Sequence, residues 1–402
     1  MSALDFFKTN ARWLLAGGLL AFGSGYGQTF FISIFAAEIM GTFNLSHGEW
    51  GGIYSLGTTA SAIIMLWAGG LSDHFRARTL GAVFLALLAT ACLLMSQVSA
   101  IWALPFAIFA LRFTGQGMLS HIAVVAVSRW FTVARGKALA VSSLGFSIGQ
   151  ALLPLIFVSL LAFIDWRQLW VLAAGITVLM IPILFLLLNK ERTPKSIAAT
   201  SETLGMMGRH WTRRQTLSHG LFWLALPAVI APATFSTALF FQQVHLADTK
   251  GWEHSQFVAL FPLYTLVSIG TTMLTGWAVD RWGTARLLPW YQIPMALSFL
   301  VFSYGDTLTM AAVAFVLMAL MNGAGAVLAS TFWPEFYGTR HLGSIKALAT
   351  SVMVLGSAIG PAISGILIDK GINFADQMIG IAIYVIFASA LAWLAMRRYK
   401  PN

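Results

Sequence analysis

The sequence predicts an all-α membrane protein in which twelve transmembrane helices form two six-helix bundles related by a pseudo-two-fold axis. Three observations predict this fold: the apolar composition, a series of long apolar runs and an internal repeat. Hydrophobic residues make up 58% of the 402 residues and charged residues only 9%, whereas soluble domains carry about 25% charged residues. So few charges cannot cover a soluble fold of this size, and most of the surface is expected to face lipid.

Twelve apolar runs are each about 20 residues or longer, which is enough for a helix to cross a bilayer. Helices are expected because backbone polar groups in lipid must find partners within their own segment. The runs cover residues 13–40, 50–70, 79–97, 101–128, 138–163, 167–188, 217–246, 254–278, 286–304, 307–332, 345–368 and 375–396.

Positive charge fixes the expected orientation of these helices. With the N-terminus inside, 20 of the 24 Lys and Arg residues fall on the inner side, three fall outside and one, Arg112, lies within a helix. Because Lys and Arg collect in cytoplasmic loops, we expect both termini in the cytoplasm and the chain in the cell (inner or plasma) membrane. The net charge of +10 resides in short turns rather than on a polar face, so we expect no nucleic-acid partner.

One long polar stretch divides the chain in two. Residues 189–215 are rich in basic residues, Ser and Thr and show no apolar periodicity, so we interpret them as a cytoplasmic linker. The linker separates an N-terminal six-helix bundle, residues 1–188, from a C-terminal six-helix bundle, residues 216–402.

The two halves carry the same motif. GGLSDHFRAR begins at Gly69 and GWAVDRWGTAR begins at Gly276, and in each an aspartate, Asp73 or Asp280, follows the glycine by four residues. Further matches at nearly the same offset join Gly115 and Gly117 to Gly323 and Gly325, and Lys137–Ala140 to Lys346–Ala349. Both copies begin on the inner side, so the repeat is parallel, about an axis along the membrane normal.

With these motifs the chain resembles the major facilitator superfamily of secondary transporters along its whole length. The stretch Gly276–Arg286 is similar to the family's loop motif after helices 2 and 8, whereas the first copy departs from it at His74 and Arg76. Arg129-Trp130-Phe131 and the following Arg135–Ala140, ahead of a glycine-rich helix, resemble the monocarboxylate-transporter-like branch. The resemblance implies two bundles that alternate access to a central site.

The resemblance also implies that the two aspartates belong to a latch that stabilises the outward-open state. A carboxylate at the inner end of a helix can sit against the N-terminus of a neighbouring helix and pair with an arginine. The alternative is a solvated turn aspartate. The gating motif comprises Gly69, Asp73, Arg78, Gly276, Asp280, Arg281, Gly283 and Arg286.

Arg112 is the one fixed charge expected deep inside the membrane. It lies about 15 Å from the outer end of its helix at 1.5 Å per residue, where a charge costs roughly 2.5–3.5 kcal/mol. We interpret it either as an anion clamp, with Gln116 on the same helical face, or as an arginine bonded to backbone carbonyls of the first helix. Candidate substrate-binding residues are Arg112, Gln116, Tyr26, Gln242, Tyr264 and Asn322.

Two residues are candidates for carrying a coupled proton. Glu38 is the one carboxylate placed within the outer half of a helix; otherwise it faces the outer water. His121 belongs to a residue type that titrates near neutral pH, and the alternative is a neutral, hydrogen-bonded packing residue.

The sequence contains no phosphate-binding loop, metal-ligand spacing or catalytic constellation. We therefore expect no enzyme, no cofactor, no metal and no direct use of ATP. We predict a monomeric secondary active transporter that moves a small organic solute, a carboxylate anion, together with protons, because a cationic site in a low-dielectric cavity favours an anion. The alternatives are an efflux antiporter of drugs or amphipathic solutes, and a membrane sensor on the same fold that binds without transporting.

Overall fold

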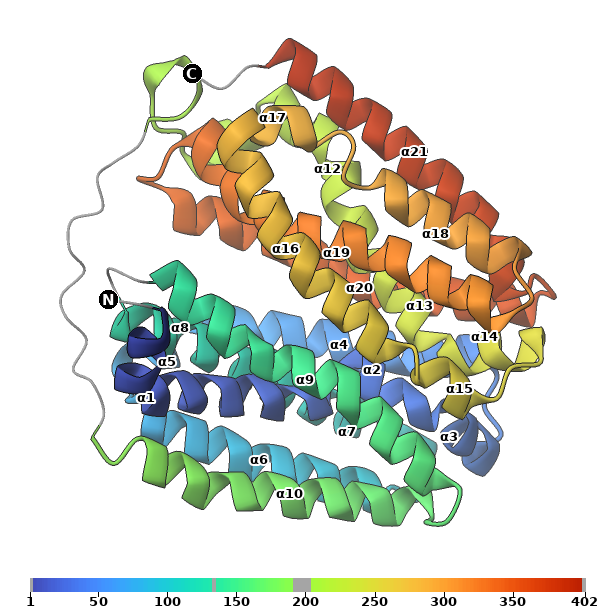
Figure 1. Cartoon of the computed structure of the whole chain (residues 1–402). Helices are drawn as coiled ribbons and strands as arrows, with labels where there is room; N and C mark the ends of the chain where they lie inside the picture. Colours follow the sequence, from blue (N-terminus) through green and yellow to red (C-terminus); the bar gives the residue numbers. More distant parts are fainter. Residues whose placement is uncertain (1–2, 132–134, 191–203, 400–402) are drawn as a thin grey trace. The chain divides into compact units, whose positions relative to one another are not determined.

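The computed structural model describes residues 3–131, 135–190 and 204–399, which are almost entirely helical (Figure 1). The chain divides into two compact units. The N-terminal unit comprises Met1–Ser46 with Gly52–Thr200, and the C-terminal unit comprises His47–Gly51 with Ser201–Asn402. The boundaries 1–188, 189–215 and 216–402 stay a prediction.

The N-terminal half of the chain contains the helices of the first repeat. In Figure 1, α6 and α10 run side by side along one flank of the N-terminal unit. The elements are α1 (Ala3–Gly23), η1 (Ser24–Gly27), α2 (Thr29–Ile32), η2 (Ser33–Phe35), α3 (Ala36–Phe43), α4 (His47–Ala68), α5 (Leu71–His74), α6 (Ala77–Gln97), η3 (Ile101–Ala103), α7 (Leu104–Leu111), η4 (Arg112–Leu119), α8 (Ser120–Trp130), α9 (Arg135–Leu161) and α10 (Trp166–Leu187).

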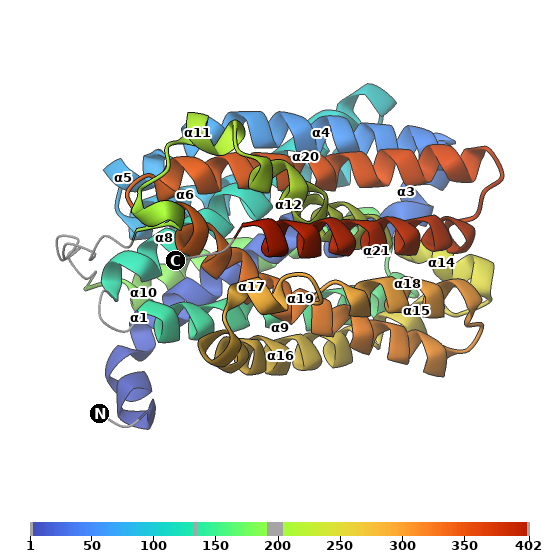
Figure 2. The ribbon, with the colours of Figure 1, turned by 90° about the horizontal axis from the view of Figure 1, so that it is seen from above.

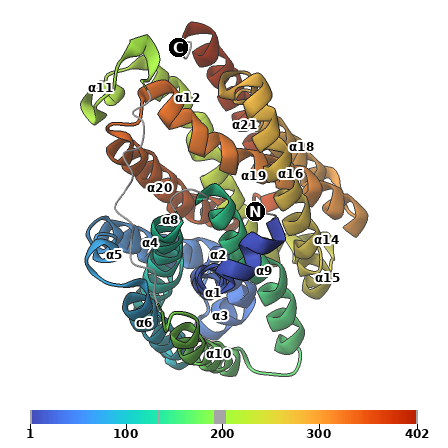
Figure 3. The same ribbon diagram turned by 60° about the vertical axis from the view of Figure 1, so that its left-hand side comes forward.

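The C-terminal half contains the second repeat. Figure 2 shows α20 and α21 running alongside each other, and α12 packs against both. Figure 3 shows α18 beside α21. The elements are η5 (Met206–Gly208), α11 (Arg213–Leu217), α12 (Gly220–Ala231), η6 (Pro232–Ser236), α13 (Thr237–Phe241), α14 (Gln243–Lys250), α15 (His254–Val258), α16 (Phe261–Trp282), α17 (Thr284–Leu287), α18 (Ile293–Tyr304), α19 (Leu308–Tyr337), α20 (Leu342–Asp369) and α21 (Phe374–Arg398).

Helices occupy every predicted membrane run. Within the described residues, ten are long and apolar enough to cross a membrane singly, and the first run is a pair, Thr9–Gly27 and Thr29–Phe43, bent by 50°. The predicted run 286–304 differs, because it contains the end of the short helix α17 and the apolar helix α18, which has only 12 residues. Pro289 cannot donate a helical hydrogen bond, and Pro294 sits in the first turn of α18, where none is needed.

Part of the predicted polar linker packs against the C-terminal unit. Met206 and Trp211 are only 2% and 3% exposed and join a cluster that includes Phe336 and Tyr337. The backbone amide of Trp211 donates to the Tyr337 carbonyl at 3.0 Å, and its indole nitrogen donates to the Met206 carbonyl at 3.2 Å. Two large apolar side chains five residues apart therefore order this stretch without any helical periodicity.

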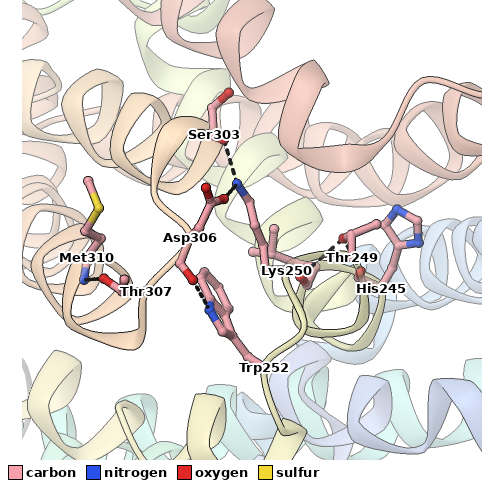
Figure 4. Close-up of polar contacts among 9 residues, drawn as sticks. His245, Thr249, Lys250, Trp252, Ser303, Asp306, Thr307 and Met310 are labelled. Carbon is pink, nitrogen blue, oxygen red and sulfur yellow. Dashed lines mark hydrogen bonds and ion pairs between the residues drawn. The ribbon is translucent and has the colours of Figure 1, made fainter.

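Two turns of the C-terminal unit are joined by polar contacts (Figure 4). Lys250, at the end of α14, donates to the Ser303 carbonyl at 2.8 Å and forms an ion pair with Asp306 at 2.9 Å. The indole of Trp252 donates to the Asp306 carbonyl at 2.9 Å. These contacts tie the turn between α14 and α15 to the turn between α18 and α19.

Candidate functional site

The first transmembrane segment is interrupted at Gln28. The short helix η1 ends there, Gln28 itself has extended backbone with ψ of 154°, and α2 begins at the next residue. Three glycines at alternate positions, Gly23, Gly25 and Gly27, weaken a regular helix at this point, because glycine loses more backbone entropy than other residues. The break frees the Gly27 carbonyl to accept a hydrogen bond from a side chain.

The fourth segment widens into the π-helix η4 beside this break. The two backbones touch directly. A Cβ atom on Gly27 would lie 2.8 Å from the Gly115 Cα atom, and one on Gly115 would lie 2.7 Å from the Gly27 Cα atom. Irregular backbone at membrane depth is tolerated where protein covers it, and π-helical turns occur frequently at functional sites.

Arg112 begins the π-helix and is only 1% exposed. Its Nη1 atom donates to the Gly27 carbonyl at 3.2 Å and to the Thr29 hydroxyl at 3.4 Å. The guanidinium lies over the Tyr54 ring, 5.4 Å from the ring centre, and the Tyr54 and Thr29 hydroxyls are 2.6 Å apart. The buried positive charge is therefore held by two neutral oxygens and one aromatic face.

One edge of this guanidinium is unused. The Nε atom of Arg112 is buried without a hydrogen-bond partner, and Nη2 donates no hydrogen bond within the described residues. Among the described residues, no carboxylate forms an ion pair with Arg112. Burying an ion without a counter-ion is costly, and the free edge has the geometry that a carboxylate accepts in a bidentate pair.

The π-helix affects the prediction that Arg112 and Gln116 lie on the same helical face. A four-residue spacing places two side chains on one face of an α-helix, but in a π-helix the hydrogen bonds join residues five apart. The α-helical argument for pairing these two side chains therefore does not apply, and Gln116 lies half-buried. The contact from Arg112 to the Gly27 carbonyl is the bond expected for a structural arginine, and the anion clamp stays a prediction.

Sequence reasoning missed Thr29 and Tyr54 as neighbours of Arg112. The glycine run that ends at Gly27 was an available signal for Thr29, because it marks the break after which Thr29 begins a new helix. Tyr54 had no comparable signal, since only the packing of α4 brings its ring over the guanidinium.

The other substrate candidates lie in separate surroundings. Tyr26 is fully buried, its ring 5.1 Å from that of Phe31 and its hydroxyl without a described partner. Gln242 is 3% exposed and donates to the Ser364 hydroxyl at 3.0 Å. Tyr264 is 2% exposed and packs among aromatic rings. Asn322 is exposed and donates to the Ser268 hydroxyl at 3.0 Å.

The two proton candidates occupy different positions. His121 lies on α8 with its Nε2 atom 3.1 Å from the Gly69 carbonyl, so it contacts the loop motif rather than Arg112. Arg129, two turns further along α8, donates to the Ser72 carbonyl. Glu38 is half-buried in the first turn of α3. The backbone of the first motif is therefore held by two side chains of α8.

Of the two predicted gating aspartates, the structure describes the side chain of Asp280. The Asp73 side chain lies outside the described residues, and Arg78 packs over the Phe185 ring at 4.8 Å. Asp280 is exposed, and no ion pair with Arg286 occurs among the described residues. The remaining residues of the second motif lie near the end of α16. A Cβ atom added at Gly276 would meet nothing within 4 Å, and Gly283 caps the helix with φ of +77°. The Arg281 guanidinium lies 5.9 Å from the centre of the Trp277 ring.

The irregular backbone recurs in the C-terminal unit. The π-helix η6, Pro232–Ser236, lies 208 positions after the segment Ser24–Gln28, which contains η1 and the break. The repeat detected in the sequence thus extends to the interruption of the first helix in each half. The fourth helix is not symmetric, because α19 is an unbroken α-helix where the repeat of η4 would fall. No group of three or more His, Cys, Asp or Glu side chains suited to a metal ion occurs in the described ranges.

Known proteins match this chain over most of its length. The family model described as Major Facilitator Superfamily matches residues 17–290 and 234–402. Monocarboxylate transporter 13 of Rattus norvegicus is 22% identical over 311 residues, 76% of this chain and 70% of the relative. An uncharacterized 38 kDa protein in the 23S RNA operon of Thermoproteus tenax is 24% identical over 392 residues, 96% of this chain and 94% of that protein.

Solved structures show the same fold. An inward-facing, unoccupied bacterial homologue of the human lysosomal transporter Spinster superposes with a TM-score of 0.73 at 16% identity, covering 97% of each chain. The nucleoside transporter NupG superposes with a TM-score of 0.71 at 14% identity, covering 96% of this chain and all of that one.

Proposed function

The chain belongs to the Major Facilitator Superfamily, and on this premise we propose that it is a secondary active transporter that moves a small carboxylate with protons by alternating access. The fold and the family make it a multi-pass membrane transporter of a small-molecule solute. The proposal adds the class of solute, the coupled ion and the residue that binds the solute.

Arg112 is the observation that carries the proposal. Interrupted helices at corresponding positions of two repeats are typical of transporter binding sites, because helix ends and unwound backbone there can hold a charged solute. In this chain such an interruption meets a buried arginine that has no carboxylate partner in the described part of the protein. A substrate carboxylate would supply the missing counter-charge.

The free edge of the guanidinium suggests how the carboxylate binds. Nη1 is held by Gly27 and Thr29, which fixes the plane of the guanidinium, while Nε and Nη2 can donate to the two oxygens of one carboxylate. Arg112 is covered in this state, so the solute reaches it when the chain moves at the break beside Gln28. The monocarboxylate transporter among the relatives favours the same class of solute.

We further propose that Glu38 or His121 carries the coupled proton. The charge asymmetry of the loops supports a protein of the cell membrane with both termini in the cytoplasm. We propose a monomer, since each six-helix repeat finds its counterpart within the same chain.

Uptake by purified protein in liposomes tests the proposal. A panel of radiolabelled monocarboxylates, dicarboxylates and neutral analogues is offered with and without an inward proton gradient, and we expect gradient-dependent accumulation of a carboxylate. Arg112→Lys keeps the charge but loses the planar fork, so its apparent affinity for the carboxylate should fall about tenfold or more. Arg213→Gln, which changes an exposed arginine, is the matched control and should transport normally.

Four results would each contradict a different part of the proposal. Unchanged apparent affinity in a well-folded Arg112→Gln variant would exclude the anion clamp. Binding of a carboxylate without accumulation would favour a sensor. Accumulation of amphipathic cations against a proton gradient, with no movement of carboxylates, would favour an efflux antiporter. If mutation of neither Glu38 nor His121 reduces the dependence on the gradient, both are excluded as the proton carrier.

A further inference from the structure

A cavity of about 400 Å³ lies in the C-terminal unit between α20, α21 and the segment η6–α13. Its volume falls in the range of small-molecule sites, about 300–1,000 Å³. Ile363 in its lining is 53% exposed, so the cavity opens at the surface of the unit. It is separate from the Arg112 site, whose residues all belong to the N-terminal unit.

Close contacts between the helices around the cavity fix their positions. A Cβ atom on Gly360 of α20 would overlap the Thr234 carbonyl, so α20 rests directly on the backbone of η6. The Phe235 and Tyr384 rings meet edge to face at 5.2 Å and hold α21 against η6. Gly380 of α21 lines the cavity without a side chain, and a Cβ atom there would meet nothing within 4 Å.

The polar groups at one end of the cavity are hydrogen-bond acceptors. The exposed carboxylate of Asp376 lines it in the first turn of α21. The amide nitrogen of Gln377 donates to the carbonyls of Ser364 at 3.1 Å and Ile372 at 2.9 Å. This leaves the Gln377 side-chain oxygen free to accept. Among the described residues that line the cavity there is no Lys, Arg or His.

The other end of the cavity is apolar. Phe235, Ile381 and Tyr384 line it. Asp376 and Tyr384 are eight residues apart on one helix, so the cavity runs about 12 Å along α21 at 1.5 Å per residue. Because Lys and Arg collect in the predicted cytoplasmic loops, the loop before α21 is expected on the outer side of the membrane. The end of the cavity at Asp376 would then lie on that side.

We propose that this cavity binds an amphipathic organic cation, with a protonated amine at Asp376 and Gln377 and an apolar chain against Phe235, Ile381 and Tyr384. The carboxylate supplies opposite charge, and the free amide oxygen accepts from the ammonium group. The apolar end removes the chain from water. An anionic head group would meet the like charge of Asp376 at the same place. The proposal does not depend on which solute Arg112 binds.

Decylamine and decanoate are the probes, because they share one chain and carry opposite charges at pH 7.5. Binding of each radiolabelled probe to the full-length protein in lipid nanodiscs is measured as the amount displaced by excess unlabelled probe, less the amount in empty nanodiscs. We expect saturable binding of about one decylamine per chain and none of decanoate.

Two variants and two matched controls locate the binding. Asp376→Asn removes the charge, and Gly380→Leu adds a side chain at a position that lines the cavity, where a Cβ atom meets nothing within 4 Å; each should weaken decylamine binding about tenfold. Glu253→Gln changes a carboxylate outside the cavity, and Gly270→Leu adds the same side chain where a Cβ atom also meets nothing within 4 Å. Neither control should change the affinity.

The proposal is overturned if decanoate binds as well as decylamine, because the cavity would then accept any apolar chain. It is also overturned if Asp376→Asn binds decylamine like the wild type, since the carboxylate would then serve only the N-terminus of α21. Asp376 is exposed, so this variant is expected to fold and gives a result even if Gly380→Leu does not.

Discussion

Adding one methyl group at Gly27 should force apart the two helices that hold Arg112. In Gly27→Ala the new Cβ atom would lie 2.8 Å from the Gly115 Cα atom, and closer still to the Leu111 carbonyl oxygen. Ordinary contacts of this kind lie at 3.4–4 Å, so the backbones must separate by at least about half an ångström. Neither neighbour is a flexible side chain that could turn away.

The magnitude follows from two opposing effects. Overpacking of a tight contact costs about 1–3 kcal/mol, and replacing glycine by alanine recovers about 0.5–1 kcal/mol of backbone entropy in a helix. We expect a net loss of about 1–2 kcal/mol, which lowers the ratio of folded to unfolded protein by a factor of about 5–30. The separation also lengthens the hydrogen bond from Arg112 to the Gly27 carbonyl, so transport should fall.

Gly175→Ala is the matched control, because Gly175 lies inside α10 and a Cβ atom there meets nothing within 4 Å. Thermal unfolding of both variants in one detergent, followed by intrinsic fluorescence, measures stability, and uptake into liposomes measures transport. Gly27→Ala should unfold at a lower temperature than the wild type, and Gly175→Ala at the same or a higher one. Equal midpoints for the two variants would refute the close packing of the two helices.

Three further predictions address other parts of the chain. Lys250→Met should lower the free energy of unfolding by about 1 kcal/mol, because it removes an ion pair and a hydrogen bond at a turn; an unchanged midpoint of thermal unfolding would contradict this. Asp280→Asn should shift the protein toward the inward-open state and lower transport more than binding, measured by accessibility labelling at the two faces; unchanged labelling and transport in both Asp73→Asn and Asp280→Asn would exclude the latch. His219 lies directly before the membrane span that begins at Gly220. Its burial, and to a smaller extent the positive charge of Arg209, lower its pKa below the ordinary value of 6.5. The folded protein should therefore lose stability as the pH falls below about 6.5. The fall in midpoint from pH 7.5 to 5.5 should be smaller in His219→Asn than in the wild type, whereas His74→Asn, at an exposed position, should match the wild type.

The sequence alone determined the class of fold and the family. Runs of apolar residues had to be helices, because backbone groups in lipid have no other partners, and the repeated motifs at Gly69 and Gly276 identified the superfamily that the family model confirms. It could not show that the run 286–304 holds only a short membrane helix, although Pro289 and Pro294 were visible signals.

The surroundings of Arg112 were decided by tertiary structure. The sequence showed that a charge lay deep in the membrane, but its hydrogen-bond partners belong to a helix 83 to 85 residues away, and such partners follow from packing rather than from local spacing. The π-helix at Arg112–Leu119 had no sequence signal and altered the spacing argument for Gln116. The cavity at Asp376 likewise arises from three segments joined only by the fold, because a cavity is a property of how side chains and glycines meet, and composition does not specify it.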